Sequence, residues 1–373
     1  MELKKLGFGM MRLPLSNPED NTQIDYDMVC KMADAYMEAG FNYFDTAAPY
    51  HSKTSETAFR ECIAKRYPRE AYILADKLSF SMVETADDLT GYFNGQLEKC
   101  GVEYIDYYLL HALNKTYYEK AKQLNAFDFV AQKKAEGKLK KVGFSFHDTA
   151  ELLDQILTEH PEMEFVQLQI NYIDWENTAI ESRKCYEVCL KHNKPIIIME
   201  PVKGGLLVNL PEDAKKVFDN ANPDASYASW AIRFAASLDD VFMVLSGMSN
   251  LDQLMDNISF MKDFQPLSES EKDTIEKVTE IIKSKNAVNC TACRYCVDGC
   301  PQHIAIPTYF QLYNETLSFG ESYFPAAKGD YQYYTNMHGK ASACVQCGKC
   351  EEQCPQHLSI IESLKAVASK FES

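Results

Sequence analysis

The sequence is poor in basic residues, with 38 Lys and Arg against 54 Asp and Glu and a formal net charge of −16 over 373 residues. Binding to a nucleic acid backbone needs clustered positive charge, so this shortage excludes that class of partner. No apolar run approaches the roughly 20 residues that a membrane-spanning helix needs, so we expect no membrane partner. The segment from Met1 to Arg12 also lacks the apolar core of a signal peptide. Together these absences favour the reducing cytoplasm.

A Gly-x-Gly-x-x-Gly motif is absent after the first predicted strand, which argues against a doubly wound dinucleotide-binding sheet. Short apolar runs instead alternate with longer helical patterns from residue 7 to about 260. The predicted strands are Gly7–Met10, Asn42–Thr46, Tyr72–Lys77, Ile105–Leu110, Val142–Ser145, Phe165–Gln169, Ile196–Met199 and Phe242–Ser246. The predicted helices are Asp25–Ala39, Ser55–Arg66, Asp87–Cys100, Ala126–Glu136, Thr149–Thr158, Ala179–His192, Ala225–Ser237, Leu251–Met261 and residues 268–284. Because the strand interiors are apolar and helical patterns follow the strands, we predict an α/β fold, a closed parallel (β/α)8 TIM barrel.

The composition changes abruptly at Cys290, where a cysteine-rich segment begins. We therefore place a domain boundary near residue 286, between a barrel domain of residues 1–285 and a small C-terminal domain of residues 286–373. Eight of the 13 cysteines lie in two runs of the C-terminal domain. The remaining five fall on helical patterns and are expected to be small buried hydrophobes: Cys30, Cys62, Cys100, Cys185 and Cys189.

The two cysteine runs share one spacing. They read Cys290-x2-Cys293-x2-Cys296-x3-Cys300-Pro and Cys344-x2-Cys347-x2-Cys350-x3-Cys354-Pro. This is the spacing of bacterial two-cluster ferredoxins, in which the fourth cysteine of each run binds the other cluster. We therefore predict an iron–sulfur, ferredoxin-like domain with two [4Fe–4S] clusters, the first held by Cys290, Cys293, Cys296 and Cys354 and the second by Cys300, Cys344, Cys347 and Cys350. Zinc is the competing metal, but structural zinc sites usually take paired cysteines from two separate knuckles.

Polar residues at successive strand ends form the second candidate site. Asp45 and Lys77 end the second and third predicted strands, His111 follows the fourth, and Tyr50 lies five residues after Asp45. Strand ends of a parallel barrel converge, so these side chains can meet. A phenol is a poor acid at neutral pH, and a nearby ammonium lowers its pKa. A carboxylate would fix that ammonium, and a neutral imidazole can orient a carbonyl oxygen.

These residues resemble the aldo-keto reductase superfamily through Asp45-Thr46-Ala47-x-x-Tyr50, Lys77 in Ala-Asp-Lys-Leu, and His111 in Leu-Leu-His. The resemblance spans residues 1 to about 260. It implies hydride transfer between NADPH or NADH and an aldehyde or ketone, with Tyr50 as the proton donor. Lys77 would lower the Tyr50 pKa, Asp45 would hold Lys77, and His111 would orient the carbonyl.

The resemblance also implies cofactor-binding residues. Ser145 and Gln167 match the residues that contact the nicotinamide amide, and the segment from Gly247 resembles the part that grips the adenosine phosphate. The full set is Ser145, Gln167, Gly247, Ser249, Gln253 and Asn257. Asn250 stands where the family often has an Arg for the 2′-phosphate, so NADP and NAD both remain candidates. The loop Glu200–Gly205 would flank the cofactor, and His51 and His147 lie near the predicted mouth.

The sequence thus predicts an NAD(P)-dependent oxidoreductase of the aldo-keto reductase type, acting on a small carbonyl or alcohol substrate. Its two clusters would serve electron transfer or structure, with a redox protein as a further partner. Nicotinamide gives two electrons as hydride, whereas each cluster accepts one. The alternative is therefore an electron-transfer iron–sulfur protein that uses the barrel as a docking scaffold or as a binding site for a flavin.

Overall fold

The computed structural model describes residues 4–178, 180–290, 292–321 and 323–373. Its internal contacts divide the chain into two compact units. The first holds Met1–Trp175, Ile180–Lys203 and Ala228–Ser268, and the second holds Glu176–Ala179, Gly204–Tyr227 and Glu269–Ser373. This division does not test the domain boundary predicted near residue 286, which stays a prediction. No helix in the described ranges is long and apolar enough to cross a membrane.

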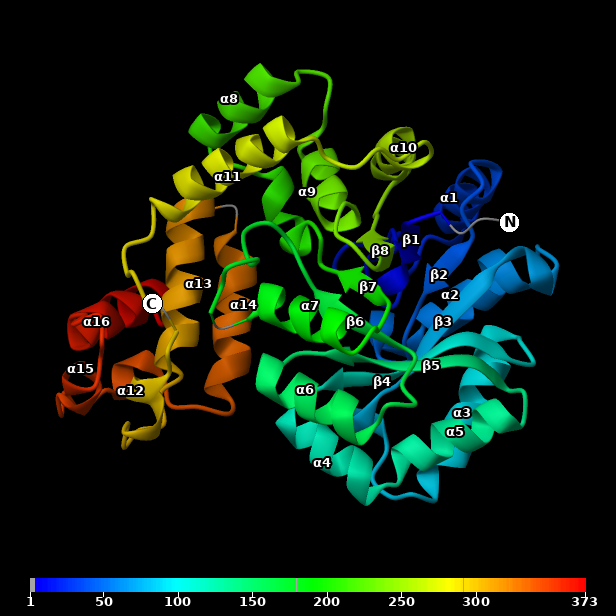
Figure 1. The fold of residues 1–373 in the computed structure, drawn as a ribbon, viewed down its shortest axis with the longest axis horizontal. Helices are drawn as coiled ribbons and strands as arrows, with labels where there is room; N and C mark the ends of the chain where they lie inside the picture. Colours follow the sequence, from blue (N-terminus) through cyan, green and yellow to red (C-terminus); the bar gives the residue numbers. More distant parts are fainter. Residues whose placement is uncertain (1–3, 179, 291, 322) are drawn as a thin grey trace. The chain divides into compact units, whose positions relative to one another are not determined.

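The first unit is built on eight parallel strands that close into a barrel in the order β1 to β8 (Figure 1). They are β1 (Leu6–Gly9), β2 (Tyr43–Asp45), β3 (Ile73–Leu78), β4 (Ile105–Leu113), β5 (Leu139–Phe146), β6 (Phe165–Gln169), β7 (Ile196–Met199) and β8 (Val241–Gly247). The ring closes where β1 pairs with β8, with Leu6 opposite Val244 and Gly9 opposite Gly247. The predicted TIM barrel is confirmed.

Helices follow the strands along this unit. They are α1 (Tyr26–Glu38), α2 (Ser55–Phe59), α3 (Asp88–Cys100), α4 (Lys115–Gln123), α5 (Ala126–Ala135), α6 (Ala150–Glu159), α7 (Ser182–Lys191), α9 (Tyr227–Ala236) and α10 (Leu251–Met261). Helix α6 illustrates why they form. The Thr149 side chain accepts a hydrogen bond from the Leu152 N–H, a cap that stabilises a helix by about 1 kcal/mol. Leu153, Ile156 and Leu157 then recur at helical spacing, so one face is buried.

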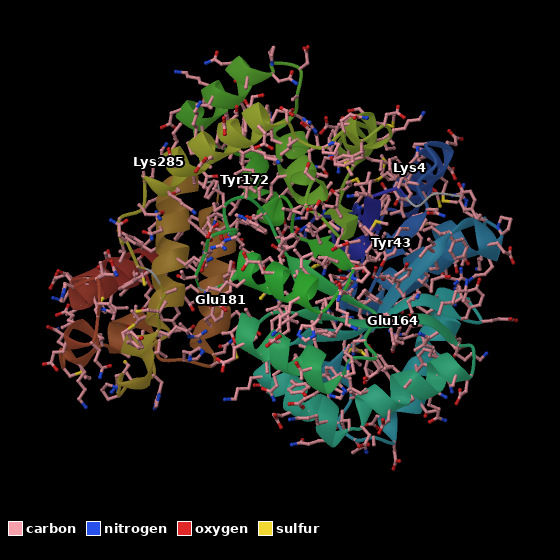
Figure 2. All side chains as sticks on the ribbon, viewed as in Figure 1. Lys4, Tyr43, Glu164, Tyr172, Glu181 and Lys285 are labelled. Atoms are coloured by element: carbon pink, nitrogen blue, oxygen red, sulfur yellow. The ribbon has the colours of Figure 1, made fainter. Side chains whose placement is uncertain are left out.

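Side chains fill the barrel interior. Tyr43, labelled in Figure 2, is fully buried, and its ring packs edge-on against Tyr107 at a centroid distance of 5.4 Å. Tyr107 in turn contacts Phe165 at 5.2 Å. At Gly143 a Cβ would lie only 2.3 Å from the Phe165 carbonyl oxygen, which explains the glycine there. Because the interior is packed, a ligand must bind at the strand ends rather than inside the barrel.

The second unit is helical. Its helices are α8 (Glu212–Ala221), α11 (Glu269–Lys283), α12 (Tyr295–Asp298), α13 (Ile306–Phe319), α14 (Phe324–Thr335), α15 (Lys349–Glu352) and α16 (Ile360–Phe371). Lys285, labelled in Figure 2, forms an ion pair of 2.8 Å with Asp213. The core of this unit includes Tyr331, which stacks on Phe371 with a centroid distance of 5.0 Å.

Before Cys290, helices α4 and α8 were not predicted, because each buries only two side chains and leaves a weak apolar pattern: Tyr118 and Ala121 in α4, Ala214 and Phe218 in α8. No helix was predicted after residue 284, so α12 to α16 were not predicted either. The predicted helix Ala179–His192 begins at Ser182, and residue 179 lies outside the described residues. The predicted helix Ser55–Arg66 is α2 followed by a π-helical turn over Arg60–Ala64.

Candidate functional site

A buried ion pair lies at the ends of β2 and β3. The Lys77 ammonium nitrogen Nζ is 2.6 Å from Asp45 Oδ1 and donates a second hydrogen bond of 2.7 Å to the Thr46 carbonyl oxygen. The exposed fraction of the two side chains is 0% for Lys77 and 4% for Asp45. Burial alone would lower the pKa of Lys77, but the Asp45 carboxylate and the Tyr50 phenol outweigh it and raise that pKa. Lys77 is therefore positively charged at neutral pH.

Tyr50 lies above this pair, in the turn after β2. The Lys77 Nζ is 4.9 Å from the centroid of the Tyr50 ring, and Tyr50 itself is half-buried. Burial raises the pKa of the phenol above its usual value, and the charge of Lys77 opposes that rise. Tyr50 therefore keeps its proton at neutral pH, while the adjacent ammonium would stabilise the phenolate left once the proton is given away.

The turn that carries Tyr50 is held by His51. Three consecutive residues after Tyr50, from His51 to Lys53, have positive φ angles between 47° and 79°. The His51 ring is buried: Nε2 accepts a hydrogen bond of 3.0 Å from the Leu13 N–H, and Nδ1 lies 3.1 Å from the Asn21 carbonyl oxygen. His51 thus anchors a strained turn to the loop after β1, and its ring nitrogens are both engaged.

His111 faces Tyr50 across the strand ends, with ring centroids 6.1 Å apart and planes at 80°. Its Nδ1 lies 2.7 Å from the Ser79 hydroxyl. Burial, followed by the charges of Lys77 and His147, lowers the pKa of His111 to about 3, so the ring is neutral at neutral pH.

The strand β4 does not end at Leu110, as predicted from the sequence, but continues past His111 to Leu113 through a bulge. The bulged residue is Ala112, with φ of 55°, and its N–H donates a 2.7 Å hydrogen bond to the Ser145 hydroxyl. Bulges re-aim side chains beside functional sites. Ser145 therefore supports the bulge next to His111, while its own O–H remains a donor. His147, which follows β5 (Leu139–Phe146), is exposed.

Gln167 carries an unsatisfied acceptor. Its side chain is buried, its Nε2 lies 3.3 Å from the Met199 sulfur, and its Oε1 has no hydrogen-bond partner among the described residues. Leaving a buried amide oxygen unpaired costs about 1–3 kcal/mol. A ligand that carries an N–H group, such as the carboxamide of a nicotinamide, would satisfy it, so the residues here fit that cofactor.

The residues of the segment after β8 form hydrogen bonds mainly with one another. The Ser249 N–H donates to Gln253 Oε1 at 2.7 Å, and the Gln253 N–H donates to Asn250 Oδ1 at 2.9 Å. Asn257, which is buried, donates from Nδ2 to the Ser246 hydroxyl at 2.7 Å. Gly247 is exposed at the end of β8. Thus Gly247, Ser249, Gln253 and Asn257 all lie at or just after this strand end, as expected.

A second buried ion pair, not predicted from the sequence, lies at the strand ends. In the loop after β7, the Lys203 Nζ is 2.9 Å from both carboxylate oxygens of Asp174, and Asn171 donates to Asp174 Oδ2 at 2.8 Å. All three side chains are buried. The sequence signal was limited to the glycine-containing loop Glu200–Gly205, since nothing in it links Lys203 to a residue 29 positions earlier.

The cysteine repeat is also a structural repeat. The short helices α12 and α15 correspond, as do the longer helices α13 and α16. Arg294 and Gly348 occupy the same position and both have positive φ, as do His303 and His357. The His303 and His357 N–H groups donate to the carbonyl oxygens of Cys300 and Cys354, each at 3.0 Å. The two histidines therefore shape the turn after each run.

Two cavities lie within this unit, and each is lined by four cysteines. The first is lined by Cys290, Cys293, Cys296 and Cys354, and the second by Cys300, Cys344, Cys347 and Cys350. These are the two predicted ligand sets, including the cysteine that each run contributes to the other. Ile306 lines both cavities, and Phe310 lines the first. Among the described residues, no group of three or more His, Cys, Asp or Glu side chains is placed to hold a single metal ion. Four thiolates around one cavity fit a cluster in which each binds a different iron.

Comparison with known proteins gave matches for both parts of the chain. The family model "Aldo/keto reductase family" matches residues 5–280, and "4Fe-4S dicluster domain" matches residues 289–359. A curated aldo-keto reductase of Mycolicibacterium smegmatis is 27% identical over 143 residues, which are 38% of this chain and 46% of that protein. The alpha 1 subunit of an acetyl-CoA decarbonylase/synthase complex of Methanosarcina acetivorans is 28% identical over 81 residues, 22% of this chain and 8% of the subunit. The chain thus spans less than half the length of these curated relatives.

Solved structures gave matches to the barrel. An aldo-keto reductase from Bacillus halodurans in its holo form has a TM-score of 0.59 and 22% identity, covering 74% of this chain and 92% of that one. An aldo-keto reductase from Klebsiella pneumoniae in complex with NADPH has a TM-score of 0.59 and 15% identity, covering 75% and 95%. At these identities the likeness bears on the fold.

Proposed function

The chain belongs to the aldo/keto reductase family, and from that premise we propose that its barrel transfers hydride between NADPH or NADH and a small carbonyl or alcohol substrate. The observation that carries the proposal is the buried Lys77–Asp45 pair with the Tyr50 ring against the ammonium. A buried lysine held in this way has no evident structural need, since apolar residues of the same size would fill the space at no electrostatic cost.

Each residue of this group has a distinct role in the proposed reaction. When bound, the nicotinamide cofactor supplies the hydride. Tyr50 gives its phenolic proton to the carbonyl oxygen, so that the product is an alcohol, and it regains a proton from solvent. Lys77 stabilises the phenolate between these two steps, and Asp45 fixes the ammonium in place.

His111 and the amide-binding residues orient the reactants. A neutral His111 that accepts a hydrogen bond from Ser79 at Nδ1 carries its proton on Nε2, from which it can donate to the substrate carbonyl. Gln167 Oε1 and the Ser145 O–H offer an acceptor and a donor for the carboxamide of the cofactor. In the proposed assignment, Gly247, Ser249, Gln253 and Asn257 shape the site for the adenosine end.

We assign the two cysteine sets that line the cavities as ligands of two [4Fe–4S] clusters, which would supply one-electron chemistry when bound. The second cysteine of each run, Cys293 or Cys347, is exposed. This exposure favours a second role for the chain, electron exchange with a redox partner protein. The Lys77–Asp45–Tyr50 arrangement favours an enzyme over a barrel that serves only as a docking scaffold. The matched structures cited above name NADPH or a holo form, and neither name mentions a flavin.

The test is carbonyl reduction by the full chain, purified anaerobically, with NADPH or NADH and a panel of small aldehydes and ketones. Tyr50→Phe should lower kcat by about 100-fold or more, because general acid catalysis typically contributes that much. Iron and acid-labile sulfide should be unchanged, which shows that the variant is folded and loaded. Equal turnover by the variant and the wild type would overturn the proposal.

A further inference from the structure

Two of the five cysteines outside the C-terminal runs meet where α1 packs on the segment after α2. Cys30 belongs to α1 and is partly exposed, whereas Cys62 is buried in the π-helical turn that follows α2. In this turn the Lys65 N–H donates to the Arg60 carbonyl oxygen, five residues earlier. Such turns are rare and are often found at functional sites. Both cysteines are free thiols, and the reaction proposed above uses neither.

Hydrogen bonds hold the two cysteines together. The Cys62 sulfur Sγ lies 3.5 Å from the carbonyl oxygen of Tyr26, one helical turn before Cys30. One nitrogen of Arg66, Nη1, donates to the carbonyl oxygens of both cysteines, at 3.3 Å to Cys30 and 3.2 Å to Cys62. Its other nitrogen, Nη2, pairs with Asp34 of α1 at 2.8 Å. The Cys62 thiol also forms a hydrogen bond with Cys30. The two sulfurs therefore need only a local approach to reach bonding distance.

The surroundings of the two thiols differ, and this gives them different roles in an oxidation. Burial, and then the hydrogen bond with Cys30, raises the pKa of the Cys62 thiol, so Cys62 keeps its proton. The hydrogen bond with Asp34 raises the pKa of the Arg66 guanidinium, and the charge of a Cys30 thiolate adds to that rise. A thiolate beside a guanidinium and open to solvent is the form of cysteine that attacks an oxidant. Cys30 is thus placed to react first, and Cys62 to react with the product.

We propose that Cys30 and Cys62 form a reversible disulfide when the protein meets hydrogen peroxide. The Cys30 thiolate attacks one peroxide oxygen, the O–O bond breaks, and Cys30 becomes a sulfenic acid while the departing hydroxide takes up a proton. The sulfur of Cys62 then bonds to the sulfur of Cys30, the thiol proton passes to the sulfenic oxygen, and water leaves. In sum, two thiols are oxidised to one disulfide and one hydrogen peroxide is reduced to two waters.

This disulfide closes a loop that carries two residues of the candidate active site. Residues 31–61 lie between the two cysteines and include Asp45 and Tyr50. A cross-link restricts the unfolded chain and so stabilises the folded one, with a larger effect for a longer loop. For a loop of this length the urea midpoint of the barrel should rise by about 1 M. The oxidised pair therefore holds the segment with Asp45 and Tyr50 in the folded barrel under oxidising conditions.

The experiment treats the full chain, purified anaerobically, with increasing hydrogen peroxide up to a large excess. The protein is then unfolded in an alkylating agent, digested with trypsin and analysed by mass spectrometry. Trypsin cuts after Lys and Arg, so the disulfide joins the peptides 13–31 and 61–65. These linked peptides should account for most of the oxidised Cys30, and dithiothreitol should separate them. The urea midpoint, followed by tryptophan fluorescence, should rise with the linked peptides and fall again after reduction.

Cys100→Ala is the matched control, since it removes another buried cysteine of the barrel and should leave the linked peptides unchanged. In Cys62→Ala the urea midpoint should not rise, and Cys30 should proceed to the sulfinic acid, because no thiol is left to capture the sulfenic acid. Cys30 that still reacts with the alkylating agent after excess peroxide would overturn the inference. Wild-type Cys30 found mainly as sulfinic acid, or linked mainly to a cysteine of the C-terminal runs, would also overturn it. Linked peptides without a rise in the urea midpoint would overturn the stabilising effect.

Discussion

The Ser79 hydroxyl lies 2.7 Å from Nδ1 of His111. Ser79 directly follows β3 and is buried, so the contact joins the end of β3 to β4 beside Tyr50. When the hydroxyl donates, the single proton of the neutral imidazole is on Nε2, where a carbonyl oxygen can accept it. A serine that the sequence analysis did not single out thus decides which nitrogen of His111 can serve the proposed reaction.

His111 should make the barrel more stable as the pH rises from 5 to 7. Its pKa falls from an ordinary 6.5 to about 3 in the folded chain, so between these values the unfolded chain binds the extra proton. The stability that neutral His111 contributes is therefore complete above pH 6.5 and is lost as the pH falls. The wild type should lose about 1–2 kcal/mol more than His111→Gln between pH 7 and 5.

The measurement is urea unfolding at both pH values, followed by tryptophan fluorescence. The two tryptophans, Trp175 and Trp230, both belong to the barrel unit and so report on it alone. An identical pH dependence in the wild type and in His111→Gln would show that His111 titrates normally in the fold.

Lys77→Met should destabilise the barrel by about 3–5 kcal/mol, because it leaves the Asp45 carboxylate buried without its cation. Asp45→Asn combined with Lys77→Met should recover most of that loss, since two neutral side chains carry no uncompensated charge. Neither variant should reduce carbonyl substrates. Urea unfolding by tryptophan fluorescence separates the two effects, and a double variant no more stable than Lys77→Met would argue against a buried charge as the cause.

The crossed cysteine sets predict a difference between two double variants. Cys290→Ala with Cys354→Ala removes two residues from one cavity and should lower iron from about eight to about four atoms per chain. Cys290→Ala with Cys300→Ala removes one residue from each cavity and should impair both clusters. Iron and acid-labile sulfide assays check this, with Cys30→Ala in the barrel as the control. Equal iron in the two double variants would contradict the crossed arrangement.

NADPH alone should not bleach the visible absorption of the clusters, because a hydride donor gives two electrons at once and each cluster accepts one. The measurement mixes anaerobic protein with NADPH, then NADH, without substrate. Dithionite must bleach the clusters in the same preparation, which shows that they can be reduced. Rapid bleaching by nicotinamide would mean that the chain carries a mediator between hydride and single electrons.

Most of the strands were predictable because both faces of a parallel barrel strand are largely buried, so the strand interior reads as an apolar run. Ile196–Met199 is an example in which the predicted and observed bounds are the same. The bulge at Ala112 was not predictable, since an alanine with φ of 55° carries none of the glycine signal that marks left-handed backbone. The end of β4 was therefore placed too early.

The features of the candidate site also divide into those that could be predicted from the sequence and those that could not. The cysteine sets could be predicted because their spacing along the chain is itself the signal, and the cavities are lined as that spacing implies. The contacts of Ser79 with His111 and of Lys203 with Asp174 were not predictable, because no local pattern connects residues so far apart in the sequence. Both depend on which strands are neighbours in the closed barrel.

The sharing of cysteines between the two cavities sets an order of maturation. The ribosome makes the chain from its N-terminus, so Cys290, Cys293 and Cys296 emerge early. Cys354 emerges after all the other cysteines of the two runs. The second cavity takes Cys300 from the first run, and this cysteine has already been synthesised when Cys350 emerges. The cavity that is begun first is therefore completed last. In the proposed assignment, the second cluster can assemble once Cys350 has emerged, whereas the first must wait for translation to pass Cys354.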